Sequence, residues 1–107
     1  MRVDFNDDRK HVKVTGLDQW DYGQKLEIYG IPNVTHAEVH ICCENDTEAL
    51  IIQAQVTEHI TADIPDALLR TGENLKAYVY IATATEGKTI RTITMIVNRR
   101  QRPEDYT

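Results

Sequence analysis

Hydrophobic and polar residues alternate with a period of two along most of the chain. In residues 75–83 the apolar set Leu75, Ala77, Val79 and Ile81 alternates with Lys76, Tyr78, Tyr80 and Ala82. Successive side chains of a β-strand point to opposite faces, so this period is typical of strands with one buried face. Alternation or a short apolar run predicts strands over residues 10–15, 25–30, 37–43, 49–55, 58–64, 75–83 and 89–97.

Turn-forming residues separate these runs. They are Gly16-Leu17-Asp18, Gly30-Ile31-Pro32-Asn33, Glu44-Asn45-Asp46 and Glu86-Gly87-Lys88. The last turn lies between two good strands and predicts a β-hairpin of residues 75–83 and 89–97. The one helical signal is the stretch Pro65–Leu69, closed by Gly72, which has room for a single turn.

The spacing of these elements predicts an all-β fold. Seven or eight short strands at near-regular intervals favour an antiparallel β-sandwich of immunoglobulin-like architecture. The Cys–Trp–Cys spacing of true immunoglobulin domains is missing, so the likeness concerns architecture only. We expect one domain over residues 1–97, followed by a polar, basic exit linker over residues 98–107.

Net charge and apolar content narrow the classes of partner. The formal net charge is −5, and Lys and Arg are scattered except near the end of the chain. Phosphate binding requires a dense positive face, so we expect neither nucleic acid nor an anionic membrane as the main partner. No apolar run approaches the roughly 18 residues of a transmembrane helix. The first ten residues lack the apolar segment of a secretory signal.

Few residues form a pattern that predicts chemistry. Cys42 and Cys43 are adjacent on an expected strand and point to opposite faces, which predicts two reduced thiols. His36 and His40 lie about 13 Å apart along such a strand, too far to share one zinc ion. The chain contains no serine, and its acidic residues form no acid/base pair by local spacing. We therefore expect no enzymatic activity, no metal site and no cofactor.

The aromatic residues allow two interpretations. Tyr78 and Tyr80 share the strand face opposite the apolar set and are expected to point outward, as candidate docking residues together with Arg99, Arg100 and Arg102. Trp20, with Tyr22 and Gly23, is expected to form a structural anchor beside a turn. In the alternative interpretation, Trp20 and the surface tyrosines stack on sugar rings, and the protein is a carbohydrate-binding module.

Several short motifs together resemble the N-terminal domain of phage baseplate proteins of the upper-baseplate type and of tail-fibre or head-fibre proteins. These proteins come from phages and prophages of Gram-positive bacteria. The motifs cover nearly the whole chain. They are Gly16–Gln24 with Leu26–Gly30, Ala37–His40, Ala62–Leu69, Leu75–Tyr80, Gly87–Ile93 and Arg100–Tyr106.

The resemblance implies a β-sandwich that anchors a fibre or receptor-binding part to the virion, with Trp20 packed at the entry to strand 25–30. It implies a virion protein made in the bacterial host cytoplasm, whose partners are other virion proteins and copies of itself. A trimer is inferred from how fibres are built. The polar segment 98–107 then resembles the linker that leads to a missing or separate fibre part.

Overall fold

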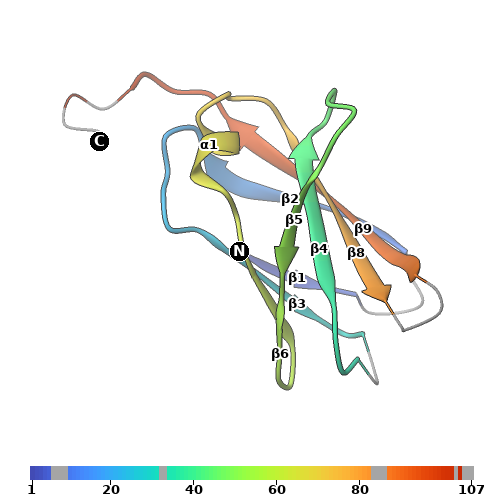
Figure 1. Cartoon of the computed structure of the whole chain (residues 1–107). Coiled ribbons are helices and arrows are strands. Elements are labelled where there is room, and N and C mark those ends of the chain that lie inside the picture. Colours follow the sequence, from blue (N-terminus) through green and yellow to red (C-terminus); the bar gives the residue numbers. More distant parts are fainter. Residues whose placement is uncertain (6–9, 32–33, 83–86, 103, 105–107) are drawn as a thin grey trace.

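The chain folds into two β-sheets packed against each other (Figure 1). The computed structural model describes residues 1–5, 10–31, 34–82, 87–102 and 104. Among these residues, one sheet has the order β1-β3-β7-β6 and the other β2-β9-β8-β4-β5. The strands are β1 Arg2–Asp4, β2 His11–Asp18, β3 Lys25–Tyr29, β4 Glu38–Cys43, β5 Leu50–Gln53, β6 Gln55–Val56, β7 Ile60–Asp63, β8 Leu75–Ala82 and β9 Gly87–Asn98. The predicted all-β sandwich is confirmed.

The central strands follow the order of an immunoglobulin-like sandwich. β3, β7 and β6 take the places of strands B, E and D, and β9, β8, β4 and β5 those of G, F, C and C′. β8 and β9 pair antiparallel, which confirms the predicted hairpin. Its connection at residues 83–86, including Glu86 of the predicted turn, lies outside the described residues, as do Pro32 and Asn33.

The structure departs from the predicted antiparallel pattern in three respects. β1 runs parallel to β3, and β2 runs parallel to β9, so both sheets are mixed. The described residues form nine strands rather than seven or eight. β1 is only three residues long and buries one side chain, Val3, so its period could not be read from the sequence. The run predicted as one strand over residues 49–55 is divided into β5 and β6, which join different sheets.

A turn predicted at Gly16-Leu17-Asp18 is instead an irregularity within β2. The pairing of β2 with β9 shifts register between Val14 and Leu17, and Gly16 has a φ of 111°. Glycine adopts such a backbone conformation without the steric cost of a Cβ atom. The shift turns Leu17 into the core, where it is 1% exposed, and β2 continues to Asp18.

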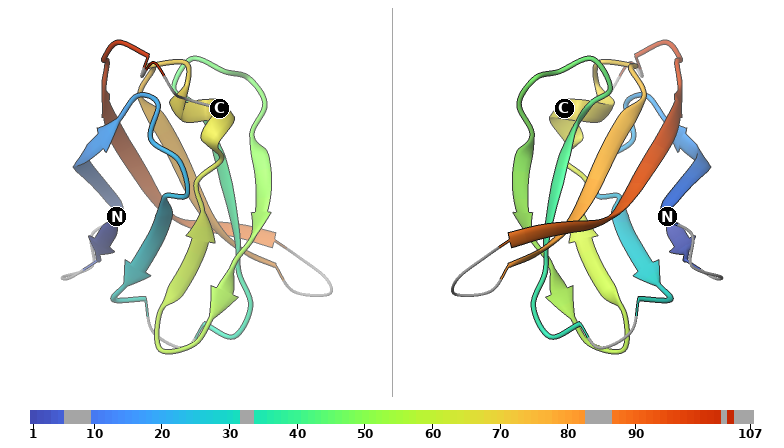
Figure 2. Two further views of the ribbon diagram at one scale, coloured as in Figure 1. Left: turned by 90° about the vertical axis from the view of Figure 1, so that its left-hand side faces the viewer. Right: turned by 90° about the vertical axis from the view of Figure 1, so that its right-hand side faces the viewer.

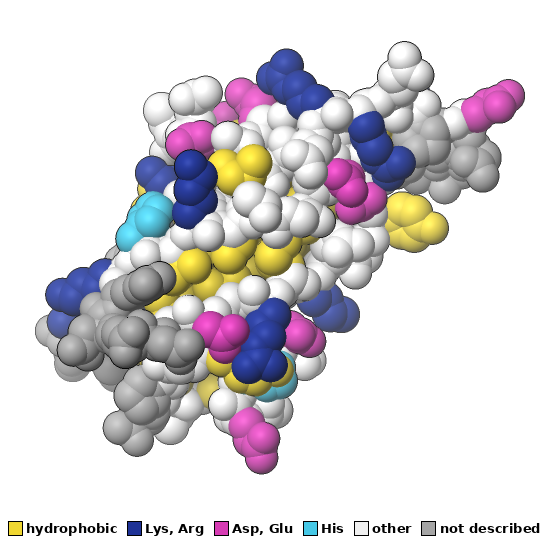
Figure 3. All heavy atoms as spheres, turned by 180° about the vertical axis from the view of Figure 1, so that it is seen from behind, with side chains coloured by type: hydrophobic (Ala, Val, Ile, Leu, Met, Phe, Trp, Pro, Cys, Tyr) yellow, Lys and Arg dark blue, Asp and Glu magenta, His cyan; other side chains and the backbone are white. Residues whose placement is uncertain are grey.

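Most of the core consists of the inward-facing members of the alternating runs, as predicted. The fully buried side chains include Leu26, Ile28, Val39, Ile41, Leu75, Val79, Ile93 and Met95. β2 contributes Val12 and Val14, which are half-buried and pack against this core. Seen from behind, a strip of apolar side chains crosses the middle of the molecule between polar rims (Figure 3). Burial of this alternating set holds the two sheets together.

The predicted helical turn is present as α1, Asp66–Leu69. Pro65 precedes it as N-cap, and Leu69, its last residue, is fully buried. Within the described part of the chain, no helix has the length and apolar character needed to cross a membrane.

Both cysteines are buried and free. Cys43 belongs to the core, whereas Cys42 is on the opposite face of β4, as the strand period predicts. Burial raises the pKa of both thiols, which keeps them protonated near neutral pH.

The N-terminal strand is held by a close backbone contact. The Phe5 amide donates a hydrogen bond of 2.9 Å to the Tyr29 carbonyl, and the Phe5 side chain is 4% exposed. Gly30 follows with a φ of 88°, and a Cβ atom there would lie 2.5 Å from the Phe5 carbonyl oxygen. Only glycine satisfies both the backbone conformation and the approach.

Substitution Gly30→Ala should lower the free energy of unfolding by about 2–4 kcal/mol, because the left-handed conformation and the contact with Phe5 both become unfavourable. Gly23→Ala is the matched control, since Gly23 also has a positive φ but, apart from its chain neighbours, no atom of the described residues lies within 4 Å of the added Cβ. It should cost about 1–2 kcal/mol. Urea unfolding followed by tryptophan fluorescence measures both, and equal losses would contradict the close contact.

Candidate docking surfaces

The parallel pairing of β2 with β9 brings two chain segments together at one end of the sandwich. Leu17 lies opposite Val97, and Asp18 lies opposite Asn98. The Asn98 side-chain amide donates a hydrogen bond of 3.2 Å to an Asp18 carboxylate oxygen. Because parallel neighbours end at the same edge, the turn after β2 meets the segment after β9. We call Gln19, Trp20, Asp21, Arg99 and Arg100 the terminal-turn cluster.

Hydrogen bonds fasten the basic segment to this turn. The Gln19 amide donates to the Asn98 carbonyl at 2.8 Å, and the Arg100 amide donates to Gln19 Oε1 at 3.2 Å. The Arg100 guanidinium donates to the Gln19 carbonyl and contacts Asp21 Oδ1 at 3.1 Å. Arg99 Nε donates to the Gly72 carbonyl at 3.1 Å. The first residues of the predicted linker are therefore part of the folded body, and Asn98 ends β9.

Trp20 binds the basic segment that follows β9. Its indole Nε1 donates a hydrogen bond of 3.0 Å to the Arg100 carbonyl, and the Arg102 guanidinium carbon lies 5.6 Å from the ring centroid. The side chain is half-buried, and the residue has a φ of 75°. Its expected packing at the entry to β3 stays a prediction. The positive φ costs about 1–2 kcal/mol, which the surrounding contacts offset.

The other two expected anchor residues differ from each other. Tyr22 is 72% exposed, so it does not share the packing expected of it. Gly23 has a φ of 66°, and its amide donates a hydrogen bond of 3.0 Å to Asp66 Oδ1 at the start of α1. Gly23 thus connects the turn to the helix.

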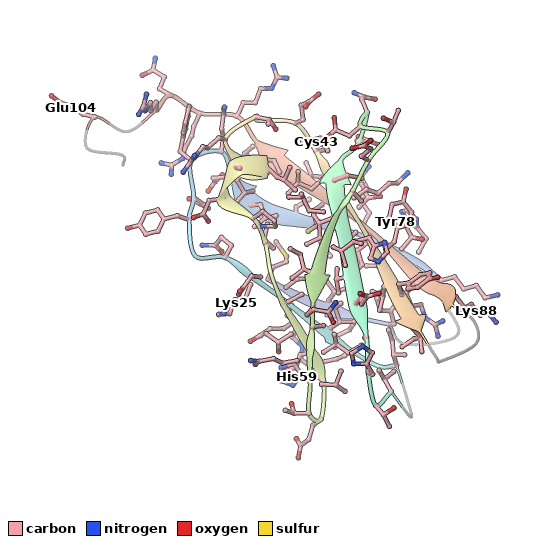
Figure 4. The ribbon with its side chains drawn as sticks, viewed as in Figure 1. Lys25, Cys43, His59, Tyr78, Lys88 and Glu104 are labelled. Atoms are coloured by element: carbon pink, nitrogen blue, oxygen red, sulfur yellow. The ribbon has the colours of Figure 1, made fainter. Side chains whose placement is uncertain are left out.

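Tyr78 and Tyr80 lie on the outer face of the five-stranded sheet, as predicted. Cross-strand pairing forms a row that consists of His11, Thr92, Tyr78, His40 and Ile51. Tyr80 stacks on His40 with ring centroids 5.0 Å apart. Both tyrosines are half-buried by their neighbours. Figure 4 shows Tyr78 beside the sheet and Glu104 on the other side of the molecule in this view. Tyr78 lies opposite Thr92 within β9, whereas the three arginines follow the end of β9 at Asn98, so the candidate docking residues fall into two groups.

His40 forms a polar contact group with residues that sequence reasoning did not combine. Its Nε2 atom lies 3.8 Å from Glu38 Oε1 and, within the described residues, has no hydrogen-bond partner. Glu38 accepts a hydrogen bond of 2.7 Å from Gln53 Nε2. His36 lies before β4 and is exposed. Where the structure describes the chain, no three His, Cys, Asp or Glu side chains form a group that could hold a metal ion.

A second surface that the sequence did not predict is the edge strand β5. Leu50 is 49% exposed and Ile51 is 59% exposed. Beside β5, a cleft of about 430 Å³ opens between loop 44–49 and α1. Its walls include Ile41, Leu50 and Leu68. The sequence signal was a run of three large apolar residues, Leu50–Ile52, which does not alternate.

Comparison with known proteins adds no assignment: no family model matches the chain, and no curated protein matches it in sequence.

Substitution Gln19→Ala should loosen the basic segment. It removes the acceptor of the Arg100 amide and the donor of a 2.8 Å bond to the Arg70 carbonyl. Trypsin should then cleave after Arg99 and Arg100 about three- to tenfold faster, because each lost hydrogen bond is worth roughly 1 kcal/mol.

Gln55→Ala is the matched control, since Gln55 is an exposed glutamine of β6, remote in sequence from the segment. Cleavage followed by mass spectrometry measures the rates. Equal rates for Gln19→Ala, Gln55→Ala and the unchanged protein would show that the turn does not hold the segment.

Proposed function

We propose that this chain is a non-enzymatic structural module of a phage virion, which anchors or assembles a baseplate, tail-fibre or head-fibre component. The motif resemblance described above supports the class. The observation that carries the proposal is the fastening of the basic segment to the turn after β2. An assembly module has to hold its attached parts in a fixed direction.

The geometry supports this role physically. Arg100 is bound through its backbone and its guanidinium, and Arg99 is bound to a different loop. Two independent attachments restrict both the position and the direction of the segment where it leaves β9. The planar Arg100 guanidinium donates to two different acceptors, the Gln19 carbonyl and Asp21 Oδ1, and its rigid fork suits such positioning better than a lysine ammonium does. The partners of the module in this proposal are other virion proteins and copies of itself.

The proposal predicts that the protein is a constituent of phage particles. Particles from a strain that carries the reading frame, banded on a density gradient, should contain its peptides in constant ratio to the major capsid protein, as measured by quantitative mass spectrometry. Gln19→Ala should lower that ratio, and Gln55→Ala should leave it unchanged. Particles without the protein would refute the proposal.

A carbohydrate-binding module is the second candidate function. The observation in its favour is Tyr22, which is 72% exposed next to Trp20. Two contacts of Trp20 argue against it. The indole N–H is bonded to the Arg100 carbonyl, and the Arg102 guanidinium lies over the ring. A stacking platform needs an aromatic face open to the sugar.

Titration with bacterial cell-wall polysaccharides, followed by Trp20 fluorescence, tests this candidate. Under the structural proposal, we expect no saturable change in emission. Saturable quenching that Tyr22→Ala weakens would instead identify a sugar-binding surface around Trp20.

A further inference from the structure

β5 ends its sheet with an unprotected edge. In the order β2-β9-β8-β4-β5, no described strand pairs with the far side of β5 (Figure 2 shows it at the margin of the molecule). Natural edge strands are usually protected by lysine, proline or a bulge. Leu50–Gln53 contains neither charge nor proline, and its pairing with β4 is regular.

The backbone of Ile51 points toward this open side. Ala54 donates a hydrogen bond of 3.2 Å to the Ala37 carbonyl, which makes these two residues a hydrogen-bonded pair. Such pairs alternate along an antiparallel ladder, so Ile52 and Leu50 also bond to β4. The N–H and C=O groups of Ile51 therefore point away from β4, where an added strand can bond to them.

The side chains next to this edge are apolar. Leu50, on the inner face, lines the cleft together with Ile41 and Leu68, and Ile51 projects from the outer face. Among the described residues, the only large hydrophobic side chains classed as exposed are these two and Tyr22. An extended segment added to β5 would find main-chain partners at Ile51 and an apolar site at Leu50, the combination used in β-strand addition.

Charge indicates the chemistry of the added segment. Residues 46–49 line the cleft, and they include the carboxylates Asp46 and Glu48 and no lysine or arginine. Lys76 lies on β8, beyond β4 as seen from the edge. A basic segment would therefore meet a complementary border.

A second copy of β5 fits this border less well. Antiparallel self-pairing centred on Ile51 would place loop 44–49 of one copy opposite residues 53–58 of the other. Those residues, Gln53 to Glu58, include no cation and end with a further carboxylate. Both copies also carry a net charge of −5.

We propose that β5 and the cleft beside it bind an extended segment of a partner protein, by strand addition, and that this segment carries apolar side chains flanked by Lys or Arg. The inference deepens the proposed function, since it names the chemistry of one partner of an assembly module. It does not involve the terminal-turn cluster.

The test uses the purified chain and two fluorescent probes, an alternating Thr-Val octapeptide with a lysine at each end and the same peptide with glutamates instead. Anisotropy should show saturable binding of the lysine peptide at low salt. The glutamate peptide should bind at least about tenfold more weakly, and higher salt should reduce the difference. Failure of the lysine peptide to bind, or equal binding of both peptides, would overturn the proposal.

Variants locate the site. Ile51→Lys should weaken binding at least about tenfold, because a charge then occupies the edge and the apolar contact is lost. Thr15→Lys places the same charge on the exposed face of β2, the opposite edge strand, and should leave binding unchanged. Asp46→Lys combined with Glu48→Lys should weaken the lysine peptide and strengthen the glutamate peptide. Unchanged urea midpoints confirm that each variant folds.

Sedimentation equilibrium of the same samples tests whether a second copy of the chain occupies β5 instead. A dimer that Ile51→Lys dissociates would identify a second copy at β5 and overturn the basic-segment proposal. The peptides are tested on the isolated chain. If they fail to bind, incorporation of the chain into particles still tests the proposed function independently. Likewise, a chain that is absent from particles but binds the lysine peptide would refute the proposed function alone.

Discussion

The terminal-turn cluster depends on the parallel pairing of β2 with β9. This pairing places Asp18 beside Asn98, although 80 positions separate them in the chain. The turn after β2 and the segment after β9 consequently leave the sandwich at the same edge. Trp20, Gln19 and Arg100 can contact one another only because of this shared end. The irregularity at Gly16 adapts β2 to this pairing and carries Leu17 into the core.

One continuous run of chain forms an edge of both sheets. The run from Leu50 to Val56 pairs with β4 through its first half and with β7 through its second half, so it passes from one sheet to the other. This crossing closes part of the sandwich and leaves the start of β5 exposed beside loop 44–49. The molecule therefore offers two separate surfaces, one that fixes its own terminal segment and one that has the geometry to receive a strand.

The alternation within a strand correctly predicted which of its residues face the core and which face outward. Tyr78 and Tyr80 were predicted to face outward because Leu75 and Val79 form the purer apolar face, and the structure agrees. Trp20 was predicted to be a structural anchor beside a turn, but its contacts with the Arg100 carbonyl and the Arg102 guanidinium could not be predicted. A local sequence pattern cannot show that Trp20 contacts a residue 80 positions away.

The sequence by itself determined the strand period, the all-β class, the β8–β9 hairpin, the helical turn at Asp66–Leu69 and the inner faces of the strands. These depend on neighbouring residues, since alternation, turn residues and proline act within a few positions. The tertiary structure alone decided the parallel partners of β1 and β2, the division of β5 from β6, and the exposure of Leu50 and Ile51. Strand pairing and edge position depend on which distant segments are adjacent, and an apolar residue looks the same in the sequence whether or not another strand covers it.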